Sequence, residues 1–254
     1  MNKNTLTHKA ILPPEMGLRS SALLRRQQLA SYLQTIAHPA LNERPLSEAL
    51  EQLFTLQACP ADRRATTEAF IHECFRSAYR ADVKKFMPRL FELVTRRGEL
   101  TAAFGVRSAA EASLFLETYL DQPIELAMEA RLGYRPAREK IVEVGNLAAI
   151  YPGAVRWLIV ALTVELYQQG YKWVVFTGTT ELKNGFHRLG LRPVVLAAAD
   201  IARLPEADRA DWGSYYATRP AVMVGNIAYG FDEIGKNCQF PKAGEVAYLD
   251  GKSS

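Results

Sequence analysis

The feature that most constrains the fold is an alternation of strand-like and helix-like segments between residues 140 and 191. Pro152 and Gly153 stand where the first helix should open, and Gly170 and Gly190 stand where the two helices should close. Such an alternation is typical of an α/β protein. The segments are a strand over Lys140–Ala148, a long apolar helix over Ala154–Gln169, a buried strand over Trp173–Thr177 and a short helix over Glu181–Leu189.

The residues before this unit predict further elements. Arg63–Tyr79 carries apolar residues at helical spacing and should face the core. Leu90–Val94 and Leu100–Val106 flank a glycine-containing turn and predict a β-hairpin. Ile124–Leu132 predicts a helix that ends at Gly133.

The two ends of the chain differ from this middle part. Ser20–Ile36 and Ser47–Leu56 have helical spacing, so residues 1–60 are expected to form an N-terminal helical extension. Residues 61–234 form the expected core, and the polar residues 235–254 form a loose C-terminal tail.

Composition excludes several classes of protein. With 254 residues and 48% hydrophobic content, the chain can bury a sizeable core without disulfides or metals. A formal charge of +4 that is spread along the sequence is too weak to indicate nucleic-acid binding. Three scattered cysteines and four scattered histidines predict a reducing compartment and no metal site.

Nothing in the sequence directs the chain to a membrane. The first fourteen residues lack the apolar stretch of a signal peptide. The apolar run Trp157–Val164 is far shorter than the roughly 20 residues that span a bilayer, so we expect a buried core helix. These observations predict a cytoplasmic protein without integral membrane contact, and they leave its oligomeric state open.

Several motifs together resemble a bacterial family called thermostable haemolysin. The resemblance covers roughly residues 63–231. The residues that carry it are Phe86–Arg89, Phe115–Leu120, Glu143 within Ile141–Leu147, Leu182–Leu191 and Trp212–Tyr216.

More distantly, the order of elements resembles the GNAT acyltransferases and their relatives, the acyl-homoserine lactone synthases and N-acyl amino acid synthases. This resemblance implies an α/β (α+β) fold in which helices flank a mixed twisted sheet. A β-bulge splays that sheet, and acyl-CoA or the phosphopantetheinyl arm of an acyl carrier protein enters the V-shaped opening. The donor is then a co-substrate, and no cofactor is bound permanently.

The resemblance also implies roles for residues. Glu143 and Asn146 match a Glu-x-x-Arg motif of the lactone synthases, with Glu143 as general base. Because Asn146 lacks the charge of that arginine, Arg107 and Arg156 become candidate partners of an anionic ligand, and Phe115 is a further candidate for substrate binding. The implied donor contacts are Leu147, Ala148, Gly153, Ala154, Thr177, Asn184 and Phe186.

Phe186 stands where GNAT enzymes carry a tyrosine that protonates the leaving thiolate, so that acid is absent. Each motif also has a plainer interpretation. On this interpretation Glu143 simply pairs with an arginine, and Gly145 and Asn146 do no more than form the bulge. The turn at Tyr151–Ala154 then reverses the chain without binding phosphate. For the aromatic residues Trp212, Tyr215 and Tyr216, the two interpretations are that they line an acyl tunnel and that they pack in the core.

The leading hypothesis is therefore an N-acyltransferase. It would move a long-chain acyl group from acyl-CoA or acyl carrier protein to an amine or amino-acid acceptor. One alternative is a membrane-lytic, pore-forming protein, as the family name suggests, although the sequence has no alternating segments typical of barrel strands. The other is a core that binds an acyl carrier protein without catalysis.

Overall fold

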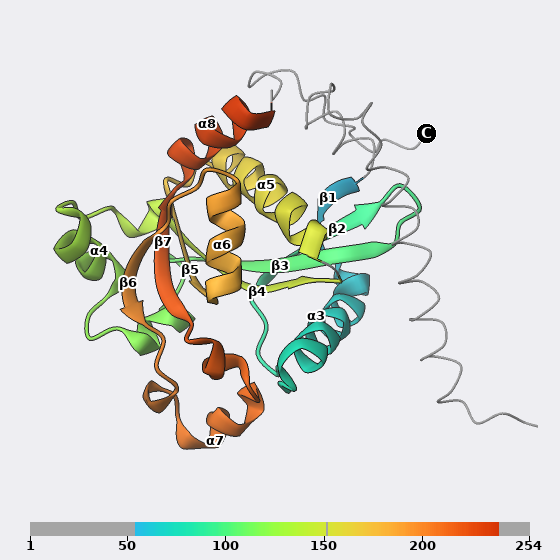
Figure 1. Cartoon of the computed structure of the whole chain (residues 1–254), viewed down its shortest axis with the longest axis horizontal. Coiled ribbons are helices and arrows are strands. Elements are labelled where there is room, and N and C mark those ends of the chain that lie inside the picture. Colours follow the sequence, from blue (N-terminus) through green and yellow to red (C-terminus); the bar gives the residue numbers. More distant parts are fainter. Residues whose placement is uncertain (1–53, 151, 239–254) are drawn as a thin grey trace, which may run out of the picture. The chain divides into compact units, whose positions relative to one another are not determined.

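The computed structural model describes residues 54–150 and 152–238. They form a seven-stranded sheet in the order β1-β2-β3-β4-β5-β7-β6, with helices on both faces (Figure 1). The strands are β1 Phe54–Ala58, β2 Arg89–Thr95, β3 Leu100–Ser108, β4 Ile141–Ala149, β5 Trp173–Gly178, β6 Val194–Ala198 and β7 Ala221–Asn226.

Six α-helices and several short 3-10 helices join these strands in the described part of the chain. The α-helices are α3 Arg64–Tyr79, α4 Ile124–Leu132, α5 Pro152–Gln168, α6 Thr180–Arg188, α7 Glu206–Arg209 and α8 Ile227–Cys238. The 3-10 helices are η2 Ala61–Arg63, η3 Phe115–Tyr119, η4 Arg138–Lys140, η5 Ile201–Arg203, η6 Ala210–Trp212 and η7 Tyr215–Thr218.

The sheet is mixed because one neighbouring pair is parallel. Strands β4 and β5 run parallel, whereas every other pair in the sheet is antiparallel. A parallel pair needs a crossover of a dozen or more residues, and α5 supplies it. The alternation predicted between residues 140 and 191, the hairpin of β2 with β3 and the mixed α/β fold are therefore confirmed.

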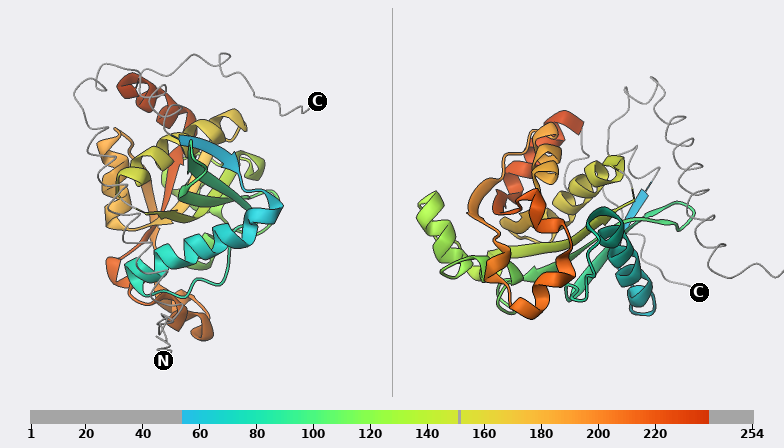
Figure 2. Two further views of the ribbon diagram at one scale, coloured as in Figure 1. Left: turned by 90° about the vertical axis from the view of Figure 1, so that its right-hand side faces the viewer. Right: turned by 60° about the horizontal axis from the view of Figure 1, so that its bottom comes forward.

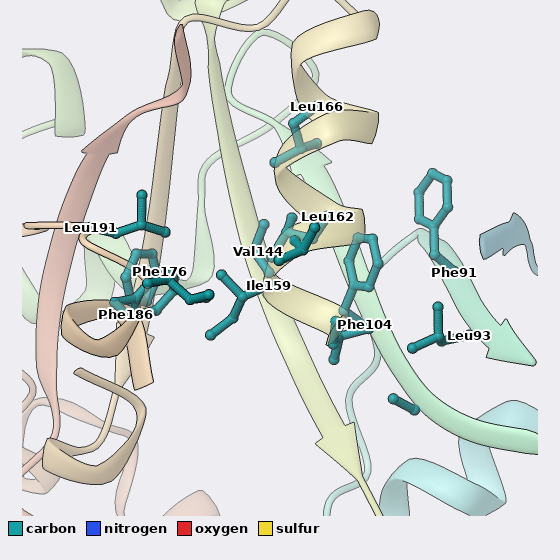
Figure 3. Packing of buried hydrophobic residues seen from close by; sticks show 14 of the residues in the cluster. Phe91, Leu93, Phe104, Val144, Ile159, Leu162, Leu166, Phe176, Phe186 and Leu191 are labelled. Atoms are coloured by element: carbon teal, nitrogen blue, oxygen red, sulfur yellow. The ribbon is translucent and has the colours of Figure 1, made fainter. Parts of the chain in front are cut away.

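Two layers of helices cover the sheet. Helices α3 and α5 lie on opposite sides of it (Figure 2). On the α5 side, α5 and α6 bury a core that includes Phe104, Val144 and Phe176 (Figure 3). On the other side, one cluster lies under α3 around Ile71 and a second lies under η3 and α4 around Met128. Because successive residues of a strand point to opposite faces, neighbours on β4 contribute to different cores.

A β-bulge interrupts β4 at Gly145 and Asn146. The register with β3 runs from Gly105↔Gly145 to Ala103↔Ala148, so β4 holds one extra residue in this interval. Asn146 takes a left-handed conformation with φ of 52°. The pairing of β4 with β5 stops just before the bulge, although both strands continue. The predicted bulge is confirmed.

Two predictions about the ends of the core were wrong. Residues 54–56, expected at the end of a helix, belong to strand β1, whose residues pair with β2. Residues 235–238, expected in a loose tail, complete helix α8, which packs against α5. In both places the tertiary partner decides the structure. The expected helix Ser20–Ile36 and the tail beyond residue 238 lie outside the described residues.

Among the described residues, no helix is both long enough and apolar enough to cross a membrane. The apolar run that begins at Trp157 forms part of α5 instead, and Leu158, Ile159 and Val160 are fully buried in the core. The prediction of a buried core helix is confirmed.

The two glycines beside the bulge give the first testable prediction. A Cβ atom at Gly105 would lie 2.4 Å from the Cβ of Met87, whereas one at Gly145 would lie 2.4 Å from Cε of Met87, the free end of that side chain. We expect Gly105→Ala to lower the free energy of unfolding by about 1–3 kcal/mol, because a Cβ cannot move without its backbone. Gly145→Ala should cost less because the methionine end can rotate.

Urea unfolding of the two variants beside the wild type measures this difference. Gly98→Ala is not a suitable control because Gly98 has a positive φ of 76°, which strains alanine even in open space. Equal losses for Gly105→Ala and Gly145→Ala would contradict the prediction.

Candidate functional site

The candidate site centres on Glu143, the third residue of β4. Its side chain is only 2% exposed. Val142 and Val144 belong to the core under α5, so Glu143 lies on the opposite face of the sheet, beneath η3. A carboxylate in this setting must find hydrogen-bond donors or give up its charge.

Two backbone amides supply those donors. The N–H of Phe115 donates to Oε2 of Glu143 and the N–H of Leu116 donates to Oε1, each over 2.9 Å. Both amides belong to the first turn of η3, where N–H groups have no partner within the helix itself. The first turn of η3 thus binds the side chain of Glu143, which is 28 positions away from Phe115 in the sequence.

Burial raises the pKa of Glu143 to about 7. The two amide hydrogen bonds and the nearby positive charge of Arg107 oppose this rise without cancelling it. Near neutral pH the carboxyl group is therefore present in both protonation states. A group with that property can accept a proton and release it again, which is what general-base chemistry requires.

Arg107 lies next to Glu143 on the neighbouring strand. The two residues are direct partners in the β3–β4 register, and the guanidinium Nη1 of Arg107 donates to the carbonyl of Ser113 over 3.2 Å. No carboxylate of the described residues forms an ion pair with this guanidinium. The interpretation that Glu143 merely pairs with an arginine therefore does not hold within that part of the chain, and Arg107 has donors to spare.

Asn146 has a different role from the one expected. Its side-chain oxygen accepts the N–H of Met87 over 2.8 Å, and its side-chain nitrogen donates to the carbonyl of Lys85 over 3.3 Å. The amide therefore holds the segment before β2 against the bulge, which explains how Met87 comes to lie on the glycines. Substrate binding by this side chain is not supported, because its oxygen is already engaged by the backbone.

The family model described as thermostable hemolysin matches residues 58–231, well over half of the chain. This chain belongs to the thermostable hemolysin family. The family suggested by the sequence motifs is thus confirmed, whereas no curated protein shows a significant match to the chain.

The fold of this hemolysin-family chain is similar to those of solved synthase structures. FeeM, an N-acyl amino acid synthase from uncultured soil microbes, superposes with a TM-score of 0.51 and 12% identity, over 74% of this chain and 98% of FeeM. The acyl-homoserine lactone synthase LasI gives 0.47 and 10%, over 69% of this chain and 91% of LasI. At these identities the similarity establishes the fold alone, and the predicted GNAT-like sheet is confirmed.

The other predicted residues of this hemolysin-family chain do not gather around Glu143. Arg156 is exposed on α5, which covers the opposite face of the sheet. Asn184 is exposed on α6, and Leu147 is half-buried against the core under α5. Gly153 lies in the first turn of α5. Arg156 therefore does not supply the anion partner expected beside Asn146.

Three of the expected donor contacts are core side chains. Ala148 is 4% exposed beneath α3, and Ala154 is fully buried in the core under α5. The ring of Phe186 packs on Phe176 with centroids 4.9 Å apart (Figure 3). Their side chains fill the core, so the expectation that these side chains contact a donor does not fit the structure. Only their backbone groups remain candidates.

Thr177 is the exception among these residues. It lies on β5 directly after Phe176, the last residue of that strand to pair with β4. Its hydroxyl oxygen is buried and has no hydrogen-bond partner among the described residues. A buried hydroxyl without a partner costs free energy, so its position next to the separation of the two strands suits a ligand that supplies the missing bond.

A pair of hydrogen-bonded phenols was not predicted from the sequence. The hydroxyls of Tyr119 and Tyr216 hydrogen-bond to each other, and burial raises the pKa of Tyr119 well above its usual range. The ring centroids of Tyr216 and Trp212, two of the predicted tunnel or core residues, lie 5.8 Å apart. Packing among aromatic rings is what the structure shows, and a role as an acyl tunnel stays a prediction.

A surface cleft lies beside η3 and α4. The cleft has a volume of about 580 Å³, is lined among others by Glu117, Glu125 and Arg138, and does not include Glu143. In the described ranges, no group of three or more histidine, cysteine or acidic side chains is placed to hold a metal ion.

The raised pKa of Glu143 has a consequence for stability. The carboxyl pKa is about 7 in the folded protein and lies near the ordinary value of 4.5 when unfolded. Between these values the folded state binds more protons, so the free energy of unfolding should fall as pH rises. This contribution amounts to about 3 kcal/mol between pH 4.5 and 7 and levels off above it.

Glu143→Gln should remove that contribution. We expect the variant to gain stability relative to the wild type from pH 5 to pH 8, as measured by urea unfolding at each pH. A constant difference between the two proteins over this range would show that Glu143 titrates normally.

Proposed function

We propose that this thermostable hemolysin family member is an N-acyltransferase that joins an acyl group from a thioester to the amine of an amino acid. The observation that carries the proposal is Glu143. It is buried, its carboxylate is bound by backbone amides, its pKa lies near neutrality, and it stands just before the point where β4 separates from β5. A perturbed carboxyl group of this kind favours a catalytic role.

The acyl donor is proposed to enter beside the bulge. Strand pairing between β4 and β5 ends at Val144 and Phe176, so backbone groups beyond these residues have no strand partner across that gap in the register. The pantetheine arm of acyl-CoA or acyl carrier protein carries amides that suit such groups. The unpartnered hydroxyl of Thr177 lies at this same place.

The acceptor is proposed to carry a carboxylate as well as an amine. Arg107 and Glu143 are direct partners across an antiparallel pair, where Cα atoms lie about 4.5–5.5 Å apart. In an α-amino acid, one carbon separates the amine from the carboxylate. The amine would meet Glu143 while the carboxylate takes the free donors of Arg107. The description of FeeM as an N-acyl amino acid synthase supports the same acceptor class.

The proposed reaction exchanges one bond for another. Glu143 takes a proton from the amine while the amine nitrogen attacks the thioester carbonyl, so a carbon–nitrogen bond forms. The tetrahedral intermediate collapses, the carbon–sulfur bond breaks and a thiolate leaves. The proton held by Glu143 then passes to the thiolate or to solvent, which restores the base. Because a thiol has a pKa near 8.5, the thiolate leaves without a strong acid, which agrees with phenylalanine at position 186.

The family name suggests a second function, direct lysis of red cells. The two functions are compatible if the reaction product is an acylated amino acid, because such a molecule has one apolar chain and one charged end. Lysis by that product would need acyl donor, whereas lysis by the protein itself would not.

We propose the cytoplasm, where acyl-CoA and acyl carrier protein occur, as the compartment of the reaction.

Thiol release and mass spectrometry test the proposed activity. The full-length protein is incubated with long-chain acyl-CoA or acyl carrier protein thioesters and a mixture of amino acids and amines. We expect an N-acyl amino acid, and a loss of about 100-fold or more in rate for Glu143→Gln, because a general base contributes at least this factor.

Glu92→Gln provides the matched control. Glu92 is an equally buried carboxylate on the same face of the sheet, but its partners are Thr67, Gln57 and Arg63, away from the site. Equal rates for Glu143→Gln and the wild type would overturn the role of Glu143. Absence of product with every donor, together with lysis of erythrocytes by protein alone, would establish the lytic function instead.

Arg107 should determine the preference for an acceptor that carries a free carboxylate. We expect the wild type to favour an amino acid over its carboxamide, and Arg107→Gln to lose this preference through a KM increase of about 10- to 100-fold for the amino acid. A charged hydrogen bond contributes an energy of this size. The carboxamide serves as the internal control because it lacks the charge. An unchanged preference in the variant would exclude Arg107 as the carboxylate partner.

A further inference from the structure

The turn that donates two amides to Glu143 is itself held by a second carboxylate. The N–H of Leu114, the residue before η3, donates to Oε2 of Glu117 over 2.8 Å. The N–H of Ile124, at the start of α4, donates to Oε1 of Glu117 over 2.8 Å. Glu117 therefore closes the turn from within and fastens it to α4.

Arg138 fastens the same turn from outside. Its Nη1 donates to Oε1 of Glu117 over 2.8 Å and to Oε2 of Glu125 over 2.6 Å. Its Nε donates to the carbonyl of Ala109 over 2.8 Å. The guanidinium thus joins the loop after β3, the helix η3 and the helix α4 through one rigid planar group.

This network is protected from water better than a surface ion pair. The side chains of Arg138 and Glu117 are 28% and 15% exposed. Burial alone would raise the pKa of Glu117, but hydrogen bonds from Arg138 and from the amides of Ile124 and Leu114 lower it below its ordinary value. Glu117 is consequently charged at neutral pH, and its bonds are charge-assisted and strong.

We propose that Glu117 and Arg138 are positioning residues that hold the turn Leu114–Glu117 so that the amides of Phe115 and Leu116 stay bonded to Glu143. The proposal deepens the proposed function, on which it rests for the role of Glu143 as base. Neither residue contacts the carboxylate of Glu143; both act through the backbone of η3.

The charged and titratable groups that face Glu143 distinguish positioning of the amides from a direct effect of the Glu117 charge on the pKa of Glu143. They are Arg107 on β3, and Glu117 and Tyr119 on η3. The amides lower the pKa of Glu143, whereas the negative charge of Glu117 raises it by a smaller amount. Removing the charge of Glu117 alone would lower the pKa, but releasing the amides would raise it.

The test is a pH titration of Glu143 in the full-length protein labelled with ¹³C at glutamate carboxyl groups. The signal is assigned by its loss in Glu143→Gln, and the titration needs no substrate. In Glu117→Gln we expect the midpoint of Glu143 to rise by about one pH unit, because both amide bonds are weakened. An unchanged or lower midpoint in a folded Glu117→Gln protein would overturn the proposal.

A second variant covers the case in which Glu117→Gln fails to fold. Arg138→Lys keeps the positive charge but loses the planar fork that bonds Glu117, Glu125 and Ala109 together. We expect the midpoint of Glu143 to rise here also, and an unchanged midpoint would count against the proposal. Glu129→Gln is the control, because Glu129 forms an exposed ion pair with Arg135 away from the turn, and it should leave the titration unchanged.

Activity gives an independent measurement. If the midpoint rises from about 7 to about 8, the ionised fraction at pH 7 falls from a half to about a tenth, so kcat/KM should drop about five-fold and recover at pH 9. A five-fold loss that persists at every pH would indicate general damage and contradict positioning. If the wild type shows no turnover, the proposed function fails, but the carboxyl titration still decides whether Glu117 and Arg138 hold the turn.

Discussion

The architecture of the candidate site depends on one extra residue in β4. The bulge at Gly145 and Asn146 ends the pairing of β4 with β5 while both strands continue. It also turns the Asn146 amide toward the segment before β2, which brings Met87 onto the sheet where two glycines leave space for it. Glu143 lies two residues before the bulge, where β4 is still paired on both sides and rigid. The Glu143 side chain is thus fixed where the pairing of β4 with β5 ends.

Two buried carboxylates on the same face show why Glu143 is unusual. Glu92 is fully buried, yet hydrogen bonds from Thr67, Gln57 and Arg63 outweigh the effect of burial and lower its pKa. Glu143 is almost as inaccessible to solvent but receives hydrogen bonds from only two neutral amides, and the nearby charge of Arg107 forms no ion pair with it, so burial prevails and its pKa rises. The two pKa values move in opposite directions because protein surrounds Glu143 more deeply than Glu92, and because the donors differ in number and charge.

The same contrast separates structural from chemical roles. The network of Glu92 joins α3, β1 and β2 and leaves the carboxylate charged, which suits a fixed point of the fold. Burial instead raises the pKa of Glu143, so its carboxyl group exchanges a proton readily near neutral pH. The turn that contacts it is bonded to Glu117 and Arg138, whose charges satisfy each other and keep the strong interactions one layer away from Glu143.

Local sequence determined most of the fold of this chain. The helices α3, α4, α5 and α6, the β2–β3 hairpin and the strands β4 and β5 follow from apolar spacing and from glycines that adopt positive φ, such as Gly133 and Gly190. Glu143 also stands out as a candidate residue from the sequence, because an acid within an apolar strand is rare. Strand β1 was missed because its structure comes from pairing with β2, some thirty residues further along the chain.

Only the tertiary structure decided which residues surround Glu143. The amides of Phe115 and Leu116, the guanidinium of Arg107 and the ties made by Arg138 come from separate segments, and no local spacing relates them. The tertiary structure likewise placed Phe186 and Ala154 in the core and used Asn146 to hold the backbone. Hydrogen bonds over long sequence separations depend on the register of the sheet and on the path of its loops, whereas periodicity reports only which face of an element is apolar.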